Sequence, residues 1–147
     1  DGVFIKGHDL IKSKKIFEII NRINPQIKKY FTNYKVKNIE NFDLTKKYLL
    51  FSGIGSPINF KNLLLKENFK ITFEMIFPDH YNYKNSDFEN ILSKANSLNT
   101  KIITTEKDYV KIPNKFKDQI DFLEVELNIN EDKDLINFIK KKLNEKY

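Results

Sequence analysis

The chain has 147 residues, of which 40% are hydrophobic and 31% are charged, a size and composition typical of one soluble globular domain. It contains no cysteine, which excludes disulfides, cysteine-ligated zinc and thiol catalysis and fits a reducing compartment. No apolar run approaches the roughly 18–20 residues that a membrane-spanning helix needs. The opening DGVFIKGHD also lacks the pattern of a signal peptide.

The net charge of +6 raises the question of a nucleic-acid partner. Arg22 is the only arginine, the lysines are scattered, and phosphate-reading surfaces favour the planar fork of arginine. We therefore expect no nucleic-acid partner, although a clustered basic face would reopen that alternative. A weak attraction to an anionic membrane surface is compatible with the charge.

The first 47 residues read as the end of one structural unit followed by a connection. Residues 2–6 (GVFIK) predict a short strand, residues 10–23 an amphipathic helix that Pro25 ends, and residues 28–37 a half-exposed strand. Residues 38–47 are polar and predict a linker. The chain does not begin with Met and opens on a strand, so we expect it to be part of a longer protein.

From residue 48 the pattern predicts a second domain, residues 48–147. Alternating strands and helices are expected, with strands at residues 48–53, 69–77, 101–105 and 121–127, and helices at residues 57–67, 87–98 and 131–145. Ser56 and Pro57 suit the start of the first helix, and Ser86 with Glu89 suggests a capping box for the second. This order predicts an α/β fold with a mostly parallel sheet flanked by helices.

The first strand of this domain ends in SGIGSP, residues 52–57. Gly53 and Gly55 allow a tight turn, and the free N–H groups of the following helix could hold an anion. A plain strand-to-helix turn explains the same residues. The spacing of a Walker A phosphate loop occurs nowhere in the chain.

The second strand ends in FPDHYNY, residues 77–83. Pro78 ends the strand, which places Asp79 and His80 in the loop that follows. A carboxylate can fix the tautomer of an imidazole, and histidine can move a proton near neutral pH. A solvated turn beside a surface histidine is the alternative interpretation.

The third strand ends in TTEKDYVKI, residues 104–112. Thr105 closes the strand, Lys107 could meet a phosphate or carboxylate, and Asp108 could hold a neighbouring loop. A polar surface turn is again the alternative. Ligands of open α/β sheets bind at the carboxyl ends of the strands, so the three ends would meet if their strands are neighbours.

These three segments, in this order and at this spacing, resemble the C-terminal part of the tetraacyldisaccharide 4'-kinase family. The family's usual segments are G-I-G-N-P-x-x-F, F-P-D-H-H-x-Y and T-T-E-K-D-x-V-K. The matching positions are Gly53, Ile54, Gly55, Pro57 and Phe60, then Phe77, Pro78, Asp79, His80 and Tyr83, then Thr104, Thr105, Glu106, Lys107, Asp108, Val110 and Lys111. Ser56 stands where Asn is usual, and Tyr81 where a second His is usual. The resemblance is strongest over residues 48–127, and VFIKG resembles the last part of the family's kinase core, which makes residues 1–47 the tail of that core plus a linker.

The resemblance implies a two-domain P-loop kinase that uses ATP and Mg²⁺ to phosphorylate the 4'-hydroxyl of a lipid A disaccharide precursor. Such a protein would act at the cytoplasmic face of the inner membrane of a Gram-negative bacterium, without an obligate protein partner. His80 and Asp79 become the candidate catalytic residues, and the candidate cofactor-binding residues are Lys107, Thr105, Gly53 and Gly55. No metal ligand is expected in this chain, because the nucleotide and Mg²⁺ would be held mainly by the N-terminal half of the family. The chain alone is then expected to be inactive, and the alternative is a stand-alone α/β domain that binds a nucleotide or sugar phosphate.

Overall fold

The computed structural model describes residues 1–6, 10–130 and 132–144. The chain divides into two compact units, which are Val36–Val125 and the combination of Asp1–Lys35 with Glu126–Tyr147. These bounds differ from the two segments 1–47 and 48–147 that the sequence suggested. Residues 36–47 belong to the unit Val36–Val125, and residues 126–147 belong to the same unit as residues 1–35. Whether residues 1–47 are the tail of a kinase core is a separate question and stays a prediction.

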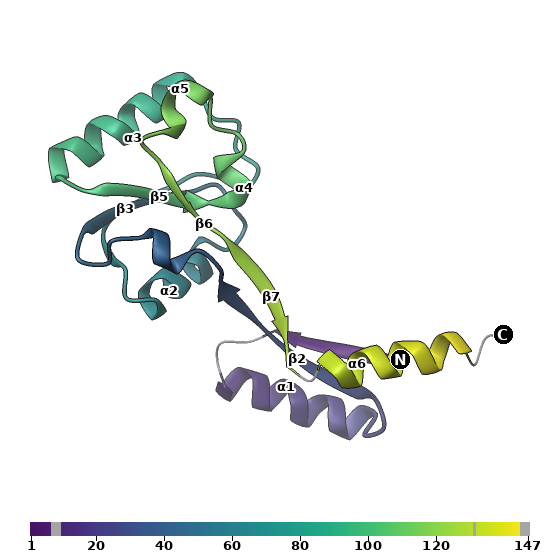
Figure 1. Ribbon diagram of the computed structural model, residues 1–147. Helices are drawn as coiled ribbons and strands as arrows, with labels where there is room; N and C mark the ends of the chain where they lie inside the picture. The colour runs from purple at the N-terminus through teal and green to yellow at the C-terminus, as the bar shows by residue number, and fades with distance from the viewer. Residues whose placement is uncertain (7–9, 131, 145–147) are drawn as a thin grey trace. The chain divides into compact units, whose positions relative to one another are not determined.

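The larger unit is built on a four-stranded sheet in the order β4-β3-β5-β6, in which every neighbouring pair is parallel (Figure 1). The predicted α/β fold with a parallel, helix-flanked sheet is therefore confirmed. Its elements are η1 (Ile39–Asn41), β3 (Lys47–Ser52), α2 (Pro57–Lys66), β4 (Lys70–Ile76), α3 (Asn85–Leu98), β5 (Lys101–Thr105), α4 (Glu106–Tyr109), α5 (Asn114–Lys117) and β6 (Asp121–Leu123).

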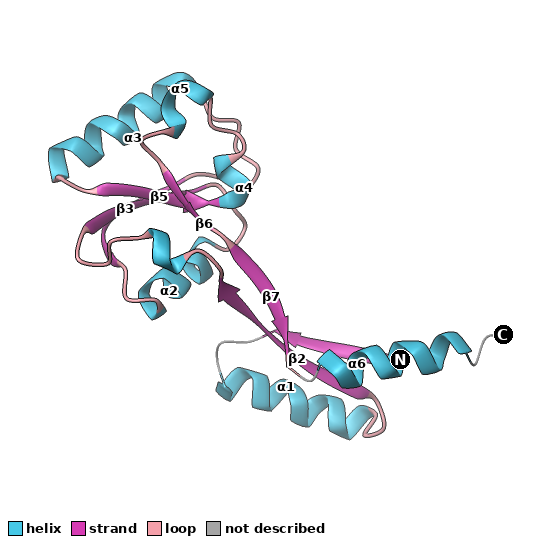
Figure 2. Cartoon of the chain, viewed as in Figure 1, coloured by secondary structure: helices cyan, strands magenta, loops and turns pink. Residues whose placement is uncertain are grey.

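The central strand β3 is buried on both faces, as its apolar run predicts. Leu49 and Phe51 point into a core that α3 completes from one side with Phe88, Ile91 and Ala95. The alternate residues of β3 face the other way, where α2 covers the sheet (Figure 2). Helices on both faces leave the carboxyl edge of the sheet as the place where loops can gather.

The smaller unit contains a three-stranded sheet in the order β1-β2-β7, formed by β1 (Gly2–Lys6), β2 (Lys28–Val36) and β7 (Val125–Ile129). β1 and β2 are parallel and are joined by α1 (Leu10–Ile23), which makes a β-α-β unit. Phe17 of α1 stacks on Phe31 at a ring distance of 6.0 Å, whereas Tyr30 meets Phe138 of α6 (Asp132–Asn144) at 6.3 Å. Adjacent residues of β2 thus face different helices.

The predicted capping box of Ser86 and Glu89 is wrong. α3 begins at Asn85, and Lys84 is its N-cap residue. The N–H of Lys84 donates to the carboxylate of Asp87 at 2.7 Å, so Asp87 makes the contact that the sequence pattern assigned to Glu89. Ser56 and Pro57 do occupy the N-cap and first position of α2, but Ser56 forms no side-chain capping bond with the described residues.

The single strand predicted for residues 121–127 is also wrong, because two short strands, β6 and β7, belong to different sheets. The break falls at Glu124, whose N–H donates to Asn38 Oδ1 at 3.0 Å. Asn38 Nδ2 in turn donates to the carbonyl of Phe122 at 3.0 Å. The buried side-chain amide of Asn38 therefore satisfies one backbone carbonyl and one backbone N–H at the point where the strand is interrupted. The final helix agrees with the prediction as far as it is described, and residues 131 and 145 lie outside the described ranges.

Candidate active site

The loops that follow β3, β4 and β5 meet at the carboxyl edge of the larger sheet. These strands are neighbours and parallel, which is the condition that the sequence left open. Gly53, after β3, donates its N–H to Asp108, after β5, at 2.9 Å. Lys107, after β5, pairs with Asp79, after β4, at 3.6 Å. The predicted convergence of the three strand ends is therefore confirmed.

Asp108 forms the buried part of this edge. Its side chain is completely shielded from solvent, and Oδ2 accepts hydrogen bonds from Gly53 N and, at 2.8 Å, from Thr105 Oγ. Lys111 Nζ lies 3.2 Å from Oδ1. A buried carboxylate is stable only when it is paired and hydrogen-bonded, and Asp108 meets both conditions. The prediction that Asp108 holds a neighbouring loop is confirmed by its bond to Gly53.

Asp79, His80 and Lys107 form the exposed part of the same edge. Their side chains are 46%, 77% and 49% exposed, so ligand atoms could reach all three. Asp79 Oδ2 lies 3.9 Å from His80 Nε2, and Asp79 Oδ1 accepts the backbone N–H of His80 at 3.0 Å. His80 adopts the left-handed backbone conformation with φ 59°, in which histidine is found more often than most residues. A carboxylate is thus flanked by an ammonium and an imidazole.

Gly55 brings this exposed part close to the first turn of α2. A Cβ placed on Gly55 would lie only 3.0 Å from Asp79 Oδ2, so a larger residue would press on the carboxylate. The beginning of a helix carries a partial positive charge, which favours anionic groups. Gly55 therefore allows an acidic side chain, or a ligand anion in its place, to approach this helix end.

Two of the predicted cofactor-binding residues use a hydrogen-bond donor within the protein. The N–H of Gly53 donates to Asp108, and Thr105 Oγ both donates to Asp108 Oδ2 and accepts from the Asp108 N–H at 3.1 Å. Thr105 is thereby the N-cap residue of α4. A contact of Gly53 or Thr105 with a cofactor stays a prediction.

Two residues at this edge received no role from the sequence. Lys111 donates to the carbonyl of Tyr81 at 3.4 Å in addition to pairing with Asp108. Burial raises the pKa of Tyr83 far above its usual range, and the nearby Asp108 carboxylate adds to this effect. The Tyr83 hydroxyl oxygen is buried without a hydrogen bond to any described residue. Tyr83 and Lys111 do belong to the second and third segments that resemble the family. That membership was the only sequence signal by which they could have been assigned to the site.

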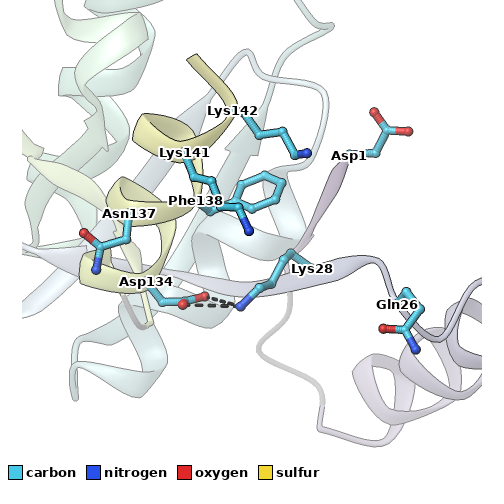
Figure 3. A pocket seen from close by; sticks show the side chains of 8 residues that line it. All are labelled: Asp1, Gln26, Lys28, Asp134, Asn137, Phe138, Lys141 and Lys142. Atoms are coloured by element: carbon cyan, nitrogen blue, oxygen red, sulfur yellow. Dashed lines mark hydrogen bonds and ion pairs between the residues drawn. The ribbon is translucent and has the colours of Figure 1, made fainter. Parts of the chain in front are cut away.

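Two cavities lie elsewhere and contain none of the predicted site residues. One of about 500 Å³ in the smaller unit is shown in Figure 3, where Lys28 pairs with Asp134 at 3.1 Å. The other, of about 310 Å³ in the larger unit, lies beside the stacked rings of Tyr109 and Phe122. Among the described residues, no three His, Asp or Glu side chains come together as metal ligands.

A parallel α/β sheet whose carboxyl edge gathers acidic and basic side chains has the architecture of a ligand-binding α/β protein. The sequence model of the family described as LpxK, tetraacyldisaccharide-1-P 4'-kinase, matches residues 4–144. The chain belongs to this family, as its resemblance in three short segments indicated.

Curated relatives agree with this assignment. A tetraacyldisaccharide 4'-kinase from Pelagibacter ubique is 40% identical over 99% of this chain and 46% of its own length. One from Rickettsia akari is 43% identical over 82% of this chain and 36% of its own length. The chain thus spans less than half the length of these relatives.

A solved structure shares the fold. The crystal structure of an "apo" form of LpxK from Aquifex aeolicus, in complex with ATP, has a TM-score of 0.52 and 15% sequence identity to this chain. The similarity covers 94% of this chain and 50% of the other. At this identity the comparison supports the fold alone.

Proposed function

We propose that the protein carrying this chain transfers a phosphoryl group from ATP to the 4'-hydroxyl of the tetraacyldisaccharide 1-phosphate precursor of lipid A. Family membership over residues 4–144 supports the reaction class. The observation that carries the proposal is the convergence of Asp79, His80 and Lys107 beside Gly55 at one sheet edge. These residues belong to the three segments in which the chain resembles the family.

Phosphoryl transfer depends on positioning and on neutralisation of charge at the phosphate oxygens. Lys107 is proposed to contact a phosphate as a mobile point charge, since its side chain is half exposed. His80 is proposed to exchange a proton with a reacting oxygen, with Asp79 orienting it. Gly55 would let the phosphates approach α2. Gly53 and Thr105 would serve the cofactor mainly by holding the loops through Asp108.

Mg²⁺ is proposed to reach this edge together with ATP. The ion is usually held by one or two carboxylates, waters and the substrate phosphates rather than by a complete protein cage. We propose that most contacts to Mg-ATP come from the part of the relatives that this chain does not match.

The proposed place of action is the cytoplasmic face of the inner membrane of a Gram-negative bacterium, where the protein would bind peripherally. None of the described helices is long and apolar enough to cross a bilayer. A net charge of +6 is compatible with attraction to anionic lipid headgroups. The proposal includes neither an obligate protein partner nor nucleic acid.

A chimera tests the reaction. The segment of the Pelagibacter ubique enzyme that matches this chain is replaced by residues 1–147, and phosphorylation of the disaccharide by Mg-ATP is measured. Activity is expected, and His80→Ala should lower turnover about a hundredfold with folding intact, the range of a positioned acid–base group. Lys107→Ala should also reduce activity. Lys47→Ala is the matched control, because Lys47 begins β3 at the opposite edge of the same sheet.

Two results would contradict the proposal. An inactive chimera that is folded would remove the support for the reaction, and full activity of His80→Ala would make the Asp79–His80 pair structural. The isolated chain is expected not to bind ATP tightly in calorimetry. A micromolar dissociation constant would instead favour a stand-alone nucleotide-binding domain.

A further inference from the structure

The buried carboxylate of Asp108 joins backbone and side-chain groups that follow different strands. Gly53, after β3, donates to Oδ2 at 2.9 Å, and Thr105, the last residue of β5, donates to the same oxygen at 2.8 Å. Oδ1 is left to Lys111 at 3.2 Å. The carboxylate accepts from three donors, which belong to three different residues. Together they fix its orientation, because a rotation would break at least one of these bonds.

Lys111 extends this connection to the loop after β4. Its Nζ donates to the carbonyl of Tyr81 at 3.4 Å and lies 5.5 Å from the centre of the Tyr83 ring. The Tyr81 N–H in turn donates to the carbonyl of Pro78 at 3.1 Å, which closes the turn that contains Asp79 and His80. Asp108 and Lys111 together therefore contact all three loops of the site.

We propose that Asp108 and Lys111 act as a pair of positioning residues that fix the three loops relative to one another, and this role rests on the proposed function. Lys107 precedes Asp108 directly in the short helix α4, so the buried carboxylate fixes the backbone position from which the Lys107 side chain extends. On the other loop, the position of Tyr81 determines the turn that presents Asp79. The pair sets the geometry in which Lys107 lies 3.6 Å from Asp79.

A positioning role predicts a loss of turnover that exceeds the loss of stability. Asp108 is fully buried, so it acts through the exposed residues instead of touching the substrate. A displacement of about 1 Å in a reacting group can lower a rate a hundredfold. We therefore expect kcat to fall and KM to change much less when the pair is broken.

The test uses Lys111→Met and Lys111→Arg in the active chimera. Lys111→Met removes the charge and the donor but keeps an unbranched side chain, and should lower kcat about tenfold to a hundredfold. Lys111→Arg keeps donors for both the carboxylate and the Tyr81 carbonyl, and should retain most of the activity. Ile91→Val, a conservative core change in α3, supplies the control for a small loss of stability without a change at the edge.

A kcat for Lys111→Met equal to that of Ile91→Val, at an equal loss of Tm, would overturn the proposal. So would equal losses for Lys111→Met and Lys111→Arg, because the conservative change would then fail to rescue. Asp108→Asn is a second variant, and it should also lower kcat with a smaller change in KM.

Amide hydrogen exchange on the 147-residue chain separates this proposal from the proposed function, since it needs no activity. In Lys111→Met, the amides of Gly53 and Tyr81 should both lose protection relative to the unchanged chain. Unchanged protection of Tyr81 would overturn the coupling of the loops. An inactive parent chimera together with joint loss of protection would mean that the coupling exists and the assigned reaction is wrong.

Discussion

The buried and exposed parts of the candidate site lie at the same sheet edge and contain the same kinds of group in different surroundings. Asp108 is shielded from solvent and accepts bonds from Gly53, Thr105 and Lys111. Asp79 is 46% exposed and faces His80 and Lys107 at longer distances of 3.9 and 3.6 Å. One carboxylate is fixed by its neighbours, and the other is left accessible.

This difference separates architecture from chemistry. Buried charges that are fully bonded hold loops in place, because breaking such a bond leaves an unpaired charge in a medium that solvates it poorly. Exposed charges at longer distances contribute little to stability and remain available to a ligand. We therefore expect mutations in the buried part to lower stability as well as turnover, and mutations in the exposed part to lower activity with little change in stability.

The largest expected effect is that of Asp108→Ala on stability. The change removes the acceptor of the Gly53 N–H and the Thr105 hydroxyl and leaves the Lys111 ammonium with the Tyr81 carbonyl alone, and it should cost about 3 kcal/mol. Asp79→Ala removes an exposed carboxylate and should cost less than about 1 kcal/mol. Urea unfolding followed through the NMR signals of β3 and β5 measures both. Equal costs for the two variants would remove the distinction between the parts.

A smaller effect is expected from the two glycines. A Cβ on Gly53 would lie 2.8 Å from the Tyr83 hydroxyl and 3.2 Å from the Pro78 carbonyl, so Gly53→Ala should cost about 1–3 kcal/mol. Gly55→Ala meets the end of the exposed Asp79 side chain, which can move, and should change stability by less than about 1 kcal/mol.

Tyr83→Phe provides the control for this steric explanation. It removes the nearest atom to the added methyl group and a buried hydroxyl that lacks a hydrogen bond to the described residues. Alone it should be neutral or stabilising by up to about 1 kcal/mol. Combined with Gly53→Ala it should recover part of the loss, which a double-mutant cycle measures. Strict additivity of the two changes would argue against the clash with the hydroxyl.

The sequence predicted the parallel sheet and the meeting of its strand ends because burial and alternation leave a strong local pattern. β3 is a continuous apolar run, and β5 ends on two threonines followed by charged residues. Asp108 could be assigned to a neighbouring loop because it lies in the segment that follows β5, where charged groups can bond to adjacent strand ends. Those predictions depended on neighbouring residues and on general topology.

The sequence could not predict features that depend on distant partners. The strand at residues 121–127 is split because Asn38, more than eighty positions earlier, bonds to the backbone of Phe122 and Glu124. The N-cap of α3 was misassigned to Ser86 because serine favours that position, whereas the helix begins at Asn85 and Lys84 is its N-cap residue. Asp87, not Glu89, accepts the hydrogen bond from the Lys84 N–H. Lys111 could be recognised only as a position of the third resembling segment, because one of its partners is the carbonyl of Tyr81 in a different loop.

The smallest expected effect concerns Asp43, an exposed carboxylate that precedes β3 and is not part of the candidate site. It shows how much a local hydrogen bond to an exposed carboxylate contributes to stability. The hydroxyl and N–H of Thr45 donate to Asp43 and hold its pKa below the usual value of 3.8. A lowered pKa in the folded state means that the ionised form is favoured on folding. Its contribution is therefore present above the unfolded pKa and is lost as the pH falls through the folded pKa.

Asp43→Asn should be less stable than the unchanged chain at about pH 7, and the difference should be smaller at about pH 2, because the contribution of the carboxylate is lost as the pH falls through its folded pKa. Urea midpoints at the two pH values measure the difference. Thr45→Val removes the hydroxyl donor and should shrink the pH-dependent part, because that hydrogen bond is the main cause of the lowered pKa. A pH-independent difference would show that the charge of Asp43 contributes nothing. The weak interactions of Asp79 would then have no reason to contribute more, since both carboxylates are exposed and accept bonds from the residues that follow them.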